Sequence, residues 1–264
     1  MKKVVLIFAI LIFNLYSIEL SNKEASIIAN KIWQNEGAGK KKYLVWWNKG
    51  EEFASCGIGH FIWFTKDKPM WFFHAFPDML KYITKHGAKP PSWLTPSTPC
   101  VWNSYKQWQE AKKKNSKKMR ELTEFLDKTK TLQAKYMVHR FNKASKKIIN
   151  YAKDPKLRAK IEYNLNRLLY KKDGTIDPQG AYCLIDYTNF KGDGTLKSER
   201  YQGLGWGLFQ VLAHMDVNNP NKYNAFANST RYILNRLIKI SPPQRRLYRF
   251  KKGWFKRVKT YENF

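Results

Sequence analysis

The segment YLVWWNKGEEFASCGIGHFIWF, residues 43–64, decides the fold. Its runs YLVWW and FASCGIG flank the turn NKGE, whose glycine suits a hairpin, and FIWF can add a third short strand. The preceding residues 21–37, SNKEASIIANKIWQNEG, predict a helix. Ser21 and Glu24 have the spacing of a capping box, and apolar residues recur at helical spacing up to Gly37, the expected C′ residue. This part of the chain is therefore predicted to form a helix followed by a small sheet.

The remainder of the chain is predicted to be mostly helical. Residues 65–100 are rich in proline and aromatic residues, which favours packed irregular structure with a short helix over 77–86. Helices are then expected near 104–114, 116–128, 130–150, 155–170, 179–188, 204–215, 221–239 and 242–259, with a glycine-rich loop over 189–203. Because no repeat or linker divides the chain, we predict one α+β domain over 19–264, with a small β-hairpin lobe over about 22–100 and a larger helical lobe over about 101–264.

The first residues predict export. MKK is a basic start, VVLIFAILIFNL is an apolar run, and a polar stretch follows, so residues 1–18 have the pattern of a secretory signal peptide. No second apolar run follows, and we expect a periplasmic or secreted protein without a stable membrane span after signal removal, an uncleaved anchor being the alternative. Three cysteines allow at most one internal disulfide, and pairing of Cys100 with Cys183 is left open.

The charge predicts an anionic partner. The chain has 49 Lys and Arg against 20 Asp and Glu, a formal net charge of +29 at pH 7. Nucleic acid, an anionic membrane surface and an acidic wall polymer all fit such a charge, and export argues against nucleic acid. Because lysine is spread along the whole chain, the charge also fits a background composition. The five histidines lack paired ligand spacing, so neither a metal nor another cofactor is expected.

Three glutamates near the hairpin carry the predicted chemistry. Glu36 continues the apolar stripe of its helix, and burial together with the negative end of the helix dipole favours its protonated form. Strand alternation places Glu51 and Ser55 on one face and Glu52 on the other. If Ser55 faces Glu36, Glu51 does so too. A protonated carboxyl, an ionised carboxylate and a hydroxyl are the groups that glycoside hydrolysis requires.

Three segments resemble the phage-type lysozymes. NEG (35–37) with SCGIGH (55–60) is similar to that family's helix ending in Glu-Gly and its Thr-x-Gly-x-Gly-His strand. YCLIDYTNFKG (182–192) resembles its central helix, and SPPQRRLYRFKKGWFKRVKTY (241–261) resembles its arginine-rich C-terminal helix. The segments occur in the family's order and bracket the chain after the signal, while the middle, about 65–180, matches only loosely. The resemblance implies a lysozyme-like fold and a glycosidase that acts on peptidoglycan.

The resemblance also implies roles for the hairpin residues. Glu36 matches the catalytic acid, and Ser55 matches a threonine that contacts the nucleophilic water. The family's second carboxylate is an aspartate, but counting back from Ser55 leads to Lys49. Glu51 is therefore expected to take that role through a shifted turn, with Glu52 as the alternative.

Four further positions carry implied roles. His60 matches a structural histidine that is usually paired with a carboxylate, and Arg245 falls near an arginine that pairs with the catalytic glutamate. Phe61 and Asn189 fall where the family lines its sugar cleft. Three other carboxylates near the glycine-rich loop could also line a cleft, although such residues more often form turns: Asp186, Asp193 and Glu199.

The combined prediction is an exported, monomeric glycoside hydrolase that cleaves the glycan strands of peptidoglycan without a metal or cofactor. Peptidoglycan carries carboxylates on its peptides, and the basic chain would bind it non-specifically. Two alternatives stay open: a lytic transglycosylase of the same superfamily, and a non-catalytic wall-binding protein on a lysozyme scaffold.

Overall fold

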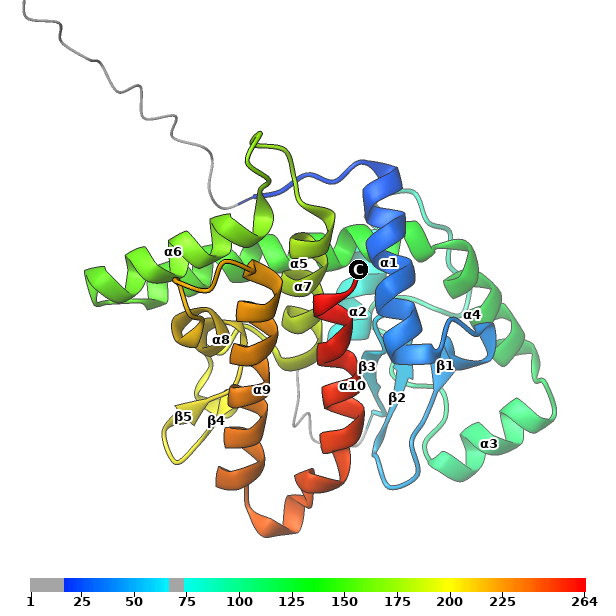
Figure 1. The fold of residues 1–264 in the computed structure, drawn as a ribbon. Helices are drawn as coiled ribbons and strands as arrows, with labels where there is room; N and C mark the ends of the chain where they lie inside the picture. The colour runs from blue at the N-terminus through cyan, green and yellow to red at the C-terminus, as the bar shows by residue number, and fades with distance from the viewer. Residues whose placement is uncertain (1–16, 67–73) are drawn as a thin grey trace, which may run out of the picture.

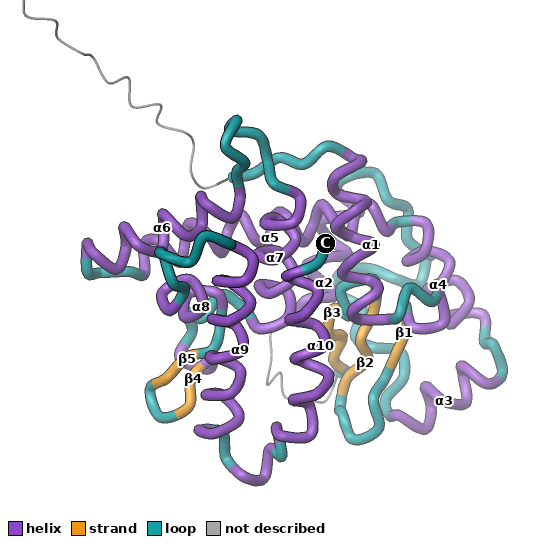
Figure 2. The backbone as a smooth tube through the Cα atoms, in the orientation of Figure 1, coloured by secondary structure: helices purple, strands orange, loops and turns teal. Residues whose placement is uncertain are grey.

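The computed structural model describes residues 17–66 and 74–264, so nearly all of the predicted signal peptide lies outside the described residues. The described chain is an α+β protein in which a small three-stranded antiparallel sheet lies to one side of a larger group of helices, with a separate two-stranded pair (Figure 1, Figure 2). The helices are α1 (Asn22–Gly37), α2 (Ala75–Lys85), α3 (Tyr105–Lys113), α4 (Lys117–Lys128), α5 (Lys130–Tyr151), α6 (Pro155–Leu169), α7 (Pro178–Lys191), α8 (Leu208–His214), α9 (Lys222–Ile240) and α10 (Lys251–Glu262). The strands are β1 (Val45–Trp46), β2 (Phe53–Cys56), β3 (Phe61–Phe64), β4 (Arg200–Tyr201) and β5 (Leu204–Gly205).

Helix α1 begins at the predicted capping box. Ser21 Oγ accepts a hydrogen bond from the Glu24 amide at 3.2 Å, and Glu24 Oε2 accepts one from the Ser21 amide at 2.9 Å. At the other end, Ala38 (φ 50°) rather than Gly37 adopts the left-handed conformation expected of the C′ residue. A Cβ on Gly37 would lie 3.2 Å from the Tyr43 Cβ, so this glycine provides close packing at the helix end.

The predicted hairpin and its third strand are present as an antiparallel sheet in the order β1-β2-β3. Trp46 lies opposite Ser55 and Val45 opposite Cys56, so each pair shares a face of the sheet. The second strand ends at Cys56, earlier than the run FASCGIG suggested. Residues 57–60 form the turn to β3, with Gly57 at φ 77° and His60 at φ 45°.

Helix α7 is the centre of the helical part, because residues 180–188 are all buried. Helices α1, α5, α6, α8, α9 and α10 all pack against it. A Cβ on Gly180 would lie 1.8 Å from the Leu168 carbonyl oxygen, so only glycine allows α6 and α7 to approach this closely. One buried hydrophobic cluster extends from Ile18 to Tyr261 and includes residues of both predicted lobes.

Two stretches of the C-terminal half differ from the predictions. The glycine-rich loop contains a 3₁₀ turn (Lys197–Glu199) and the β4–β5 pair, and the helix expected from 204 begins at Leu208. The helix expected over 242–259 is instead two 3₁₀ turns, Pro243–Arg245 and Leu247–Phe250, followed by α10. Arg246 stands between those turns in the left-handed conformation (φ 47°), which an α-helix cannot continue through.

The three cysteines are buried and free, so Cys100 and Cys183 form no disulfide in this structure. Within residues 17–66 and 74–264, no helix has both the length and the apolar character needed to cross a bilayer.

Candidate active site around Glu36

A cavity of about 600 Å³ lies where the C-terminal end of α1, strand β1 and helix α10 meet. Figure 1 shows α10 (red) beside α9, with the end of α1 directed toward the sheet. Helix α1 and the residue after it contribute Gln34, Asn35, Glu36, Gly37 and Ala38; the hairpin region contributes Tyr43, Trp46, Asn48 and His60; α10 contributes Gly253, Lys256, Arg257 and Thr260. Among the described carboxylates, Glu36 is the one that lines this cavity.

Glu36 is held from two sides. Its Oε1 accepts a hydrogen bond from Arg257 Nη2 at 2.9 Å, and its Oε2 lies 3.7 Å from His60 Nδ1. The glutamate and histidine side chains are each 17% exposed, so the carboxyl is shielded but still reaches the cavity. The prediction that Glu36 sits at the end of an apolar helix face, with His60 beside a carboxylate, agrees with this placement.

His60 faces Glu36 with the nitrogen that is free to accept a proton. Its Nε2 lies 3.1 Å from the Tyr43 carbonyl oxygen, which can only accept, so the neutral ring carries its proton on Nε2. Burial lowers the pKa of His60, opposed by Glu36 and the Tyr43 carbonyl. The ring therefore favours the neutral form, and its Nδ1 lone pair points toward Oε2 of Glu36.

Arg257, rather than the predicted Arg245, pairs with Glu36. Arg245 is exposed in the 3₁₀ turn before α10, twelve residues earlier in the chain. Arg257 donates to both oxygens of the fully buried Asp186, at 2.8 and 2.7 Å, and Tyr261 donates to the same carboxylate at 2.6 Å. Asp186 thus balances much of the positive charge of Arg257, whose Nη2 donates to both Asp186 and Glu36.

The predicted second carboxylate and hydroxyl lie outside the cavity lining. Glu51 is in the β1–β2 turn, where its Oε2 accepts a hydrogen bond from Asn48 Nδ2 at 3.1 Å. Burial raises the pKa of Glu51, while Asn48 and the more distant Arg249 lower it. Ser55 is 6% exposed within β2, and Glu52 is exposed. Strand alternation could not place Glu51, because the ladder begins only at Phe53.

The two predicted cleft residues have other surroundings. Phe61 is 1% exposed and its ring packs against Tyr136 at a centroid distance of 5.4 Å, so it belongs to the core and not to a cleft wall. Asn189 Nδ2 donates to the Gly59 carbonyl at 3.0 Å, and its Oδ1 accepts from Arg140 at 3.1 Å. Asn189 therefore ties the hairpin turn to the helical part of the protein.

An aromatic wall next to Glu36 was not predicted. The rings of Tyr43 and Trp46 meet edge to face at 4.8 Å, and Trp46 meets Trp108 at 5.3 Å. Lys112 Nζ lies 4.3 Å from the Trp46 centroid and donates to the Lys42 carbonyl at 2.8 Å. Burial lowers the pKa of Lys112 to about 8. The sequence signal that could have indicated this wall is the pair of tryptophans directly before the hairpin turn.

A polar cluster continues the cavity toward α7. Asn35 Nδ2 donates to the Tyr182 hydroxyl at 2.7 Å, and that hydroxyl lies 2.5 Å from Thr260 Oγ1. The cavity thus combines one carboxyl, a fixed guanidinium, amide groups and flat aromatic surface, a combination that suits a polar ligand with apolar ring faces.

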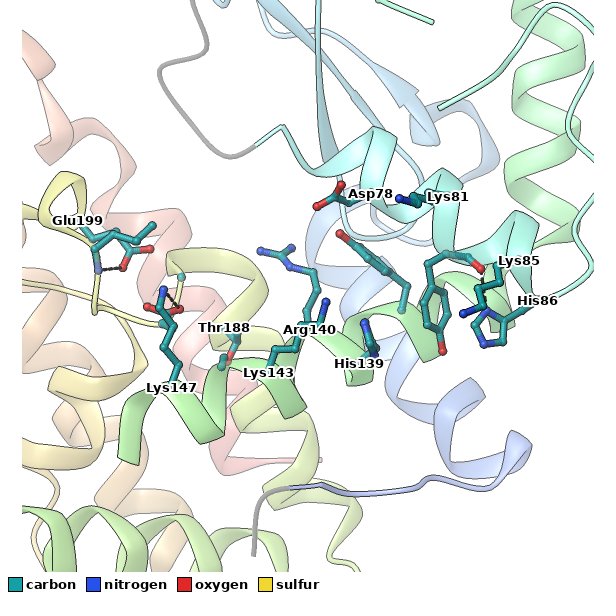
Figure 3. A pocket seen from close by; sticks show the side chains of 16 residues that line it. Asp78, Lys81, Lys85, His86, His139, Arg140, Lys143, Lys147, Thr188 and Glu199 are labelled. Atoms are coloured by element: carbon teal, nitrogen blue, oxygen red, sulfur yellow. Dashed lines mark hydrogen bonds and ion pairs between the residues drawn. The ribbon is translucent and has the colours of Figure 1, made fainter. Parts of the chain in front are cut away.

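A larger cavity of about 910 Å³ lies between α2, α5 and the loop after α7 (Figure 3). Of the carboxylates that could line a cleft, Asp193 and Glu199 line this cavity, whereas Glu36, Glu51 and Ser55 do not. Within the described part of the chain, no group of three or more His, Cys, Asp or Glu residues is placed to hold a metal ion.

No protein-family model, curated protein or solved structure matches this chain. Its function is therefore argued from the geometry around Glu36.

Proposed function

We propose that this protein is an exported, lysozyme-like glycoside hydrolase that cleaves the glycan strands of peptidoglycan, with Glu36 as the general acid. The observation that carries the proposal is the Glu36 carboxyl in a cavity at the end of α1, held between Arg257 and His60. A shielded carboxyl beside a ligand-sized cavity suits proton transfer to a leaving oxygen. The order of helix, hairpin and SCGIGH turn, which motivated the lysozyme resemblance, adds support.

The surroundings of Glu36 fit an acid that must hold and then release a proton. Arg257 shares its charge with Asp186, so Glu36 does not face an unbalanced cation. The neutral His60 places its Nδ1 3.7 Å from Oε2 and adds no positive charge beside the carboxyl. Proton transfer from Glu36 to the glycosidic oxygen would then break the bond between that oxygen and the anomeric carbon.

Substrate binding is assigned to the aromatic wall and the amides. Trp46 and Tyr43 offer flat surfaces for sugar rings, and Asn35 and Asn48 offer amide donors and acceptors for hydroxyl and acetamido groups. Lys256, which also lines the cavity, can pair with a carboxylate of the peptide stem. The net charge of +29 would add non-specific attraction to the wall.

A lytic transglycosylase is the second candidate, and one observation favours it. Glu36 is the one carboxylate among the described residues that lines the cavity, whereas Glu51 lies behind Asn48. A hydrolase needs a second group to activate water or stabilise the oxocarbenium ion. In this protein Glu51 would have to take that role. A transglycosylase needs only one carboxyl, which gives a proton to the leaving oxygen and then takes one from a hydroxyl of the same sugar.

The test uses residues 19–264 and purified peptidoglycan sacculi. We expect the turbidity of the suspension to fall as glycan strands are cut, with new reducing ends for hydrolysis or anhydro ends for transglycosylation. Release of peptides without either kind of glycan end would contradict the proposal. Sedimentation with sacculi in the absence of any cleavage would instead identify a wall-binding protein.

A further inference from the structure

The larger cavity has three walls of different origin (Figure 3). Helix α2 and the residue after it provide Asp78, Lys81, Tyr82, Lys85 and His86; α5 provides Tyr136, His139, Arg140, Lys143, Ala144 and Lys147; the end of α7 and its loop provide Thr188, Gly192, Asp193, Leu196 and Glu199. Tyr136 and Thr188 are 3% and 4% exposed and form its floor. A volume of about 910 Å³ is enough for a ligand of several linked groups.

Positive charge gathers on two of these walls. Lys81 and Lys85 are one helical turn apart on α2, and Arg140, Lys143 and Lys147 follow each other on one face of α5. Within residues 17–66 and 74–264, no carboxylate lies in ion-pair range of Lys81, Lys85 or Lys143.

The carboxylates of the third wall are already engaged. Asp193 pairs with Lys147 at 3.1 Å and accepts a hydrogen bond from the Thr195 amide at 2.8 Å. Glu199 Oε2 accepts from the Gly194 amide at 2.7 Å. These contacts fix the glycine-rich loop from inside. Asp193 balances the charge of Lys147, and Asp78, Asp193 and Glu199 each act on the charge of Arg140. The cations left without an ion-pair partner among the described residues are therefore Lys81, Lys85 and Lys143.

Arg140 is held in place before any ligand arrives. Its Nη1 donates to Asn189 Oδ1 at 3.1 Å, and Asn189 is itself anchored to the Gly59 carbonyl. Figure 3 shows the guanidinium directed into the space between α2 and the glycine-rich loop. A guanidinium fixed in this way loses little entropy when it binds a carboxylate or phosphate.

An aromatic stack forms the end of the cavity away from that loop. The rings of His86 and Tyr82 are stacked at 4.1 Å, and Tyr82 and His139 are 5.1 Å apart. Burial, with nearby Lys143, lowers the pKa of His139, and the stacked rings offer a flat surface among the cations.

We propose that this cavity binds an oligoanion that presents two or more phosphate or carboxylate groups to Arg140, Lys81 and Lys143. Cations on two facing walls require at least two anionic groups, and a lone small anion would contact only one wall. Phosphate esters and the carboxylates of a peptide stem share this chemistry. The site is separate from the cavity around Glu36, and the proposal does not depend on the glycosidase activity.

Isothermal titration calorimetry of the mature chain tests the site, with inorganic tripolyphosphate and a tricarboxylate stem peptide as ligands. The variant Lys81→Glu/Lys143→Glu reverses two exposed charges at the cavity. The variant Lys113→Glu/Lys128→Glu makes the same change in net charge at exposed positions of α3 and α4. We expect the cavity variant to bind at least about tenfold more weakly than wild type and the control variant to stay within about twofold, since tenfold is about 1.4 kcal/mol.

The stronger of the two ligands identifies the source of the anion. An equal loss of affinity in the cavity variant and the control variant would show non-specific attraction to a basic surface and would overturn the proposal. Undetectable binding of both ligands to the wild type would overturn it too. Because no glycan is present, failure here leaves the proposal for Glu36 untouched.

Discussion

Replacing Arg257 by methionine should destabilise the protein strongly. Asp186 is fully buried and would lose two charge-assisted hydrogen bonds, keeping only the one from Tyr261, while Glu36 would lose its guanidinium partner. Removing one partner of a buried ion pair typically costs about 3–5 kcal/mol, because the remaining charge stays buried without compensation. For a chain of this size, that loss lowers the melting temperature by roughly 10 °C. Urea unfolding at pH 7, followed by circular dichroism, measures the change in the free energy of unfolding.

Arg231 supplies a matched control. Arg231 also makes a bidentate ion pair: its Nη1 and Nη2 donate to the two carboxylate oxygens of Glu262 at 2.8 and 2.7 Å. However, the Arg231 and Glu262 side chains are 28% and 22% exposed. Arg231→Met should therefore cost about 1 kcal/mol or less. The double variant Arg257→Met/Asp186→Leu should recover much of the loss, because no unpaired charge is left in the core. If Arg257→Met costs no more than Arg231→Met, the reasoning about this network is wrong.

Three further predictions concern single positions. Burial lowers the pKa of Lys191 from 10.5 to about 7, so between those values the unfolded state binds more protons than the folded state and stability should rise with pH. When wild type and Lys191→Met are unfolded in urea at pH 6.5, 8 and 9.5, the variant should show a smaller rise, which comes from Lys112 because burial lowers its pKa too. Gly57→Ala should lower the free energy of unfolding by about 1–3 kcal/mol more than Gly50→Ala does. Both glycines have positive φ, but only at Gly57 would the new methyl group meet a side-chain atom, Gln133 Oε1 at 2.4 Å. Equal melting temperatures of the two variants would contradict this. Glu51→Gln should slow glycan cleavage by less than about tenfold if the reaction is transglycosylation, because Glu51 does not line the cavity. A loss as large as that of a general acid would support hydrolysis with Glu51 as the second group.

Local sequence signals predicted the elements well. The capping box at Ser21 and the glycine of the NKGE turn act between near neighbours, and both are present in the structure. The helices predicted over 155–170 and 179–188 begin within one residue of α6 and α7, where Asp154 and Asp177 accept hydrogen bonds from the first turn. The break at Arg246 carried no such signal, because a left-handed arginine is set by its surroundings and not by its own preference.

The side-chain partners of Glu36 could not be read from the sequence. Arg257 and Glu36 are 221 residues apart, and Arg257 and Asp186 are 71 apart. Which arginine of an arginine-rich segment turns inward depends on where its helix begins, and two 3₁₀ turns shift α10 relative to the expected helix. The prediction for Phe61 failed for a related reason: an apolar residue in a strand packs on whatever covers that face, which here is Tyr136 of α5.

The most direct test of the central claim is mass spectrometry of the muropeptides released from purified sacculi by the wild type and by Glu36→Gln. Glutamine keeps the shape of the side chain and can still pair with its neighbours, but it has no proton to give to the leaving oxygen. We expect the wild type to release glycan fragments and the variant, folded and still sedimenting with sacculi, to release them about 10²–10⁴-fold more slowly. Release of the same fragments at the wild-type rate by Glu36→Gln would contradict the account.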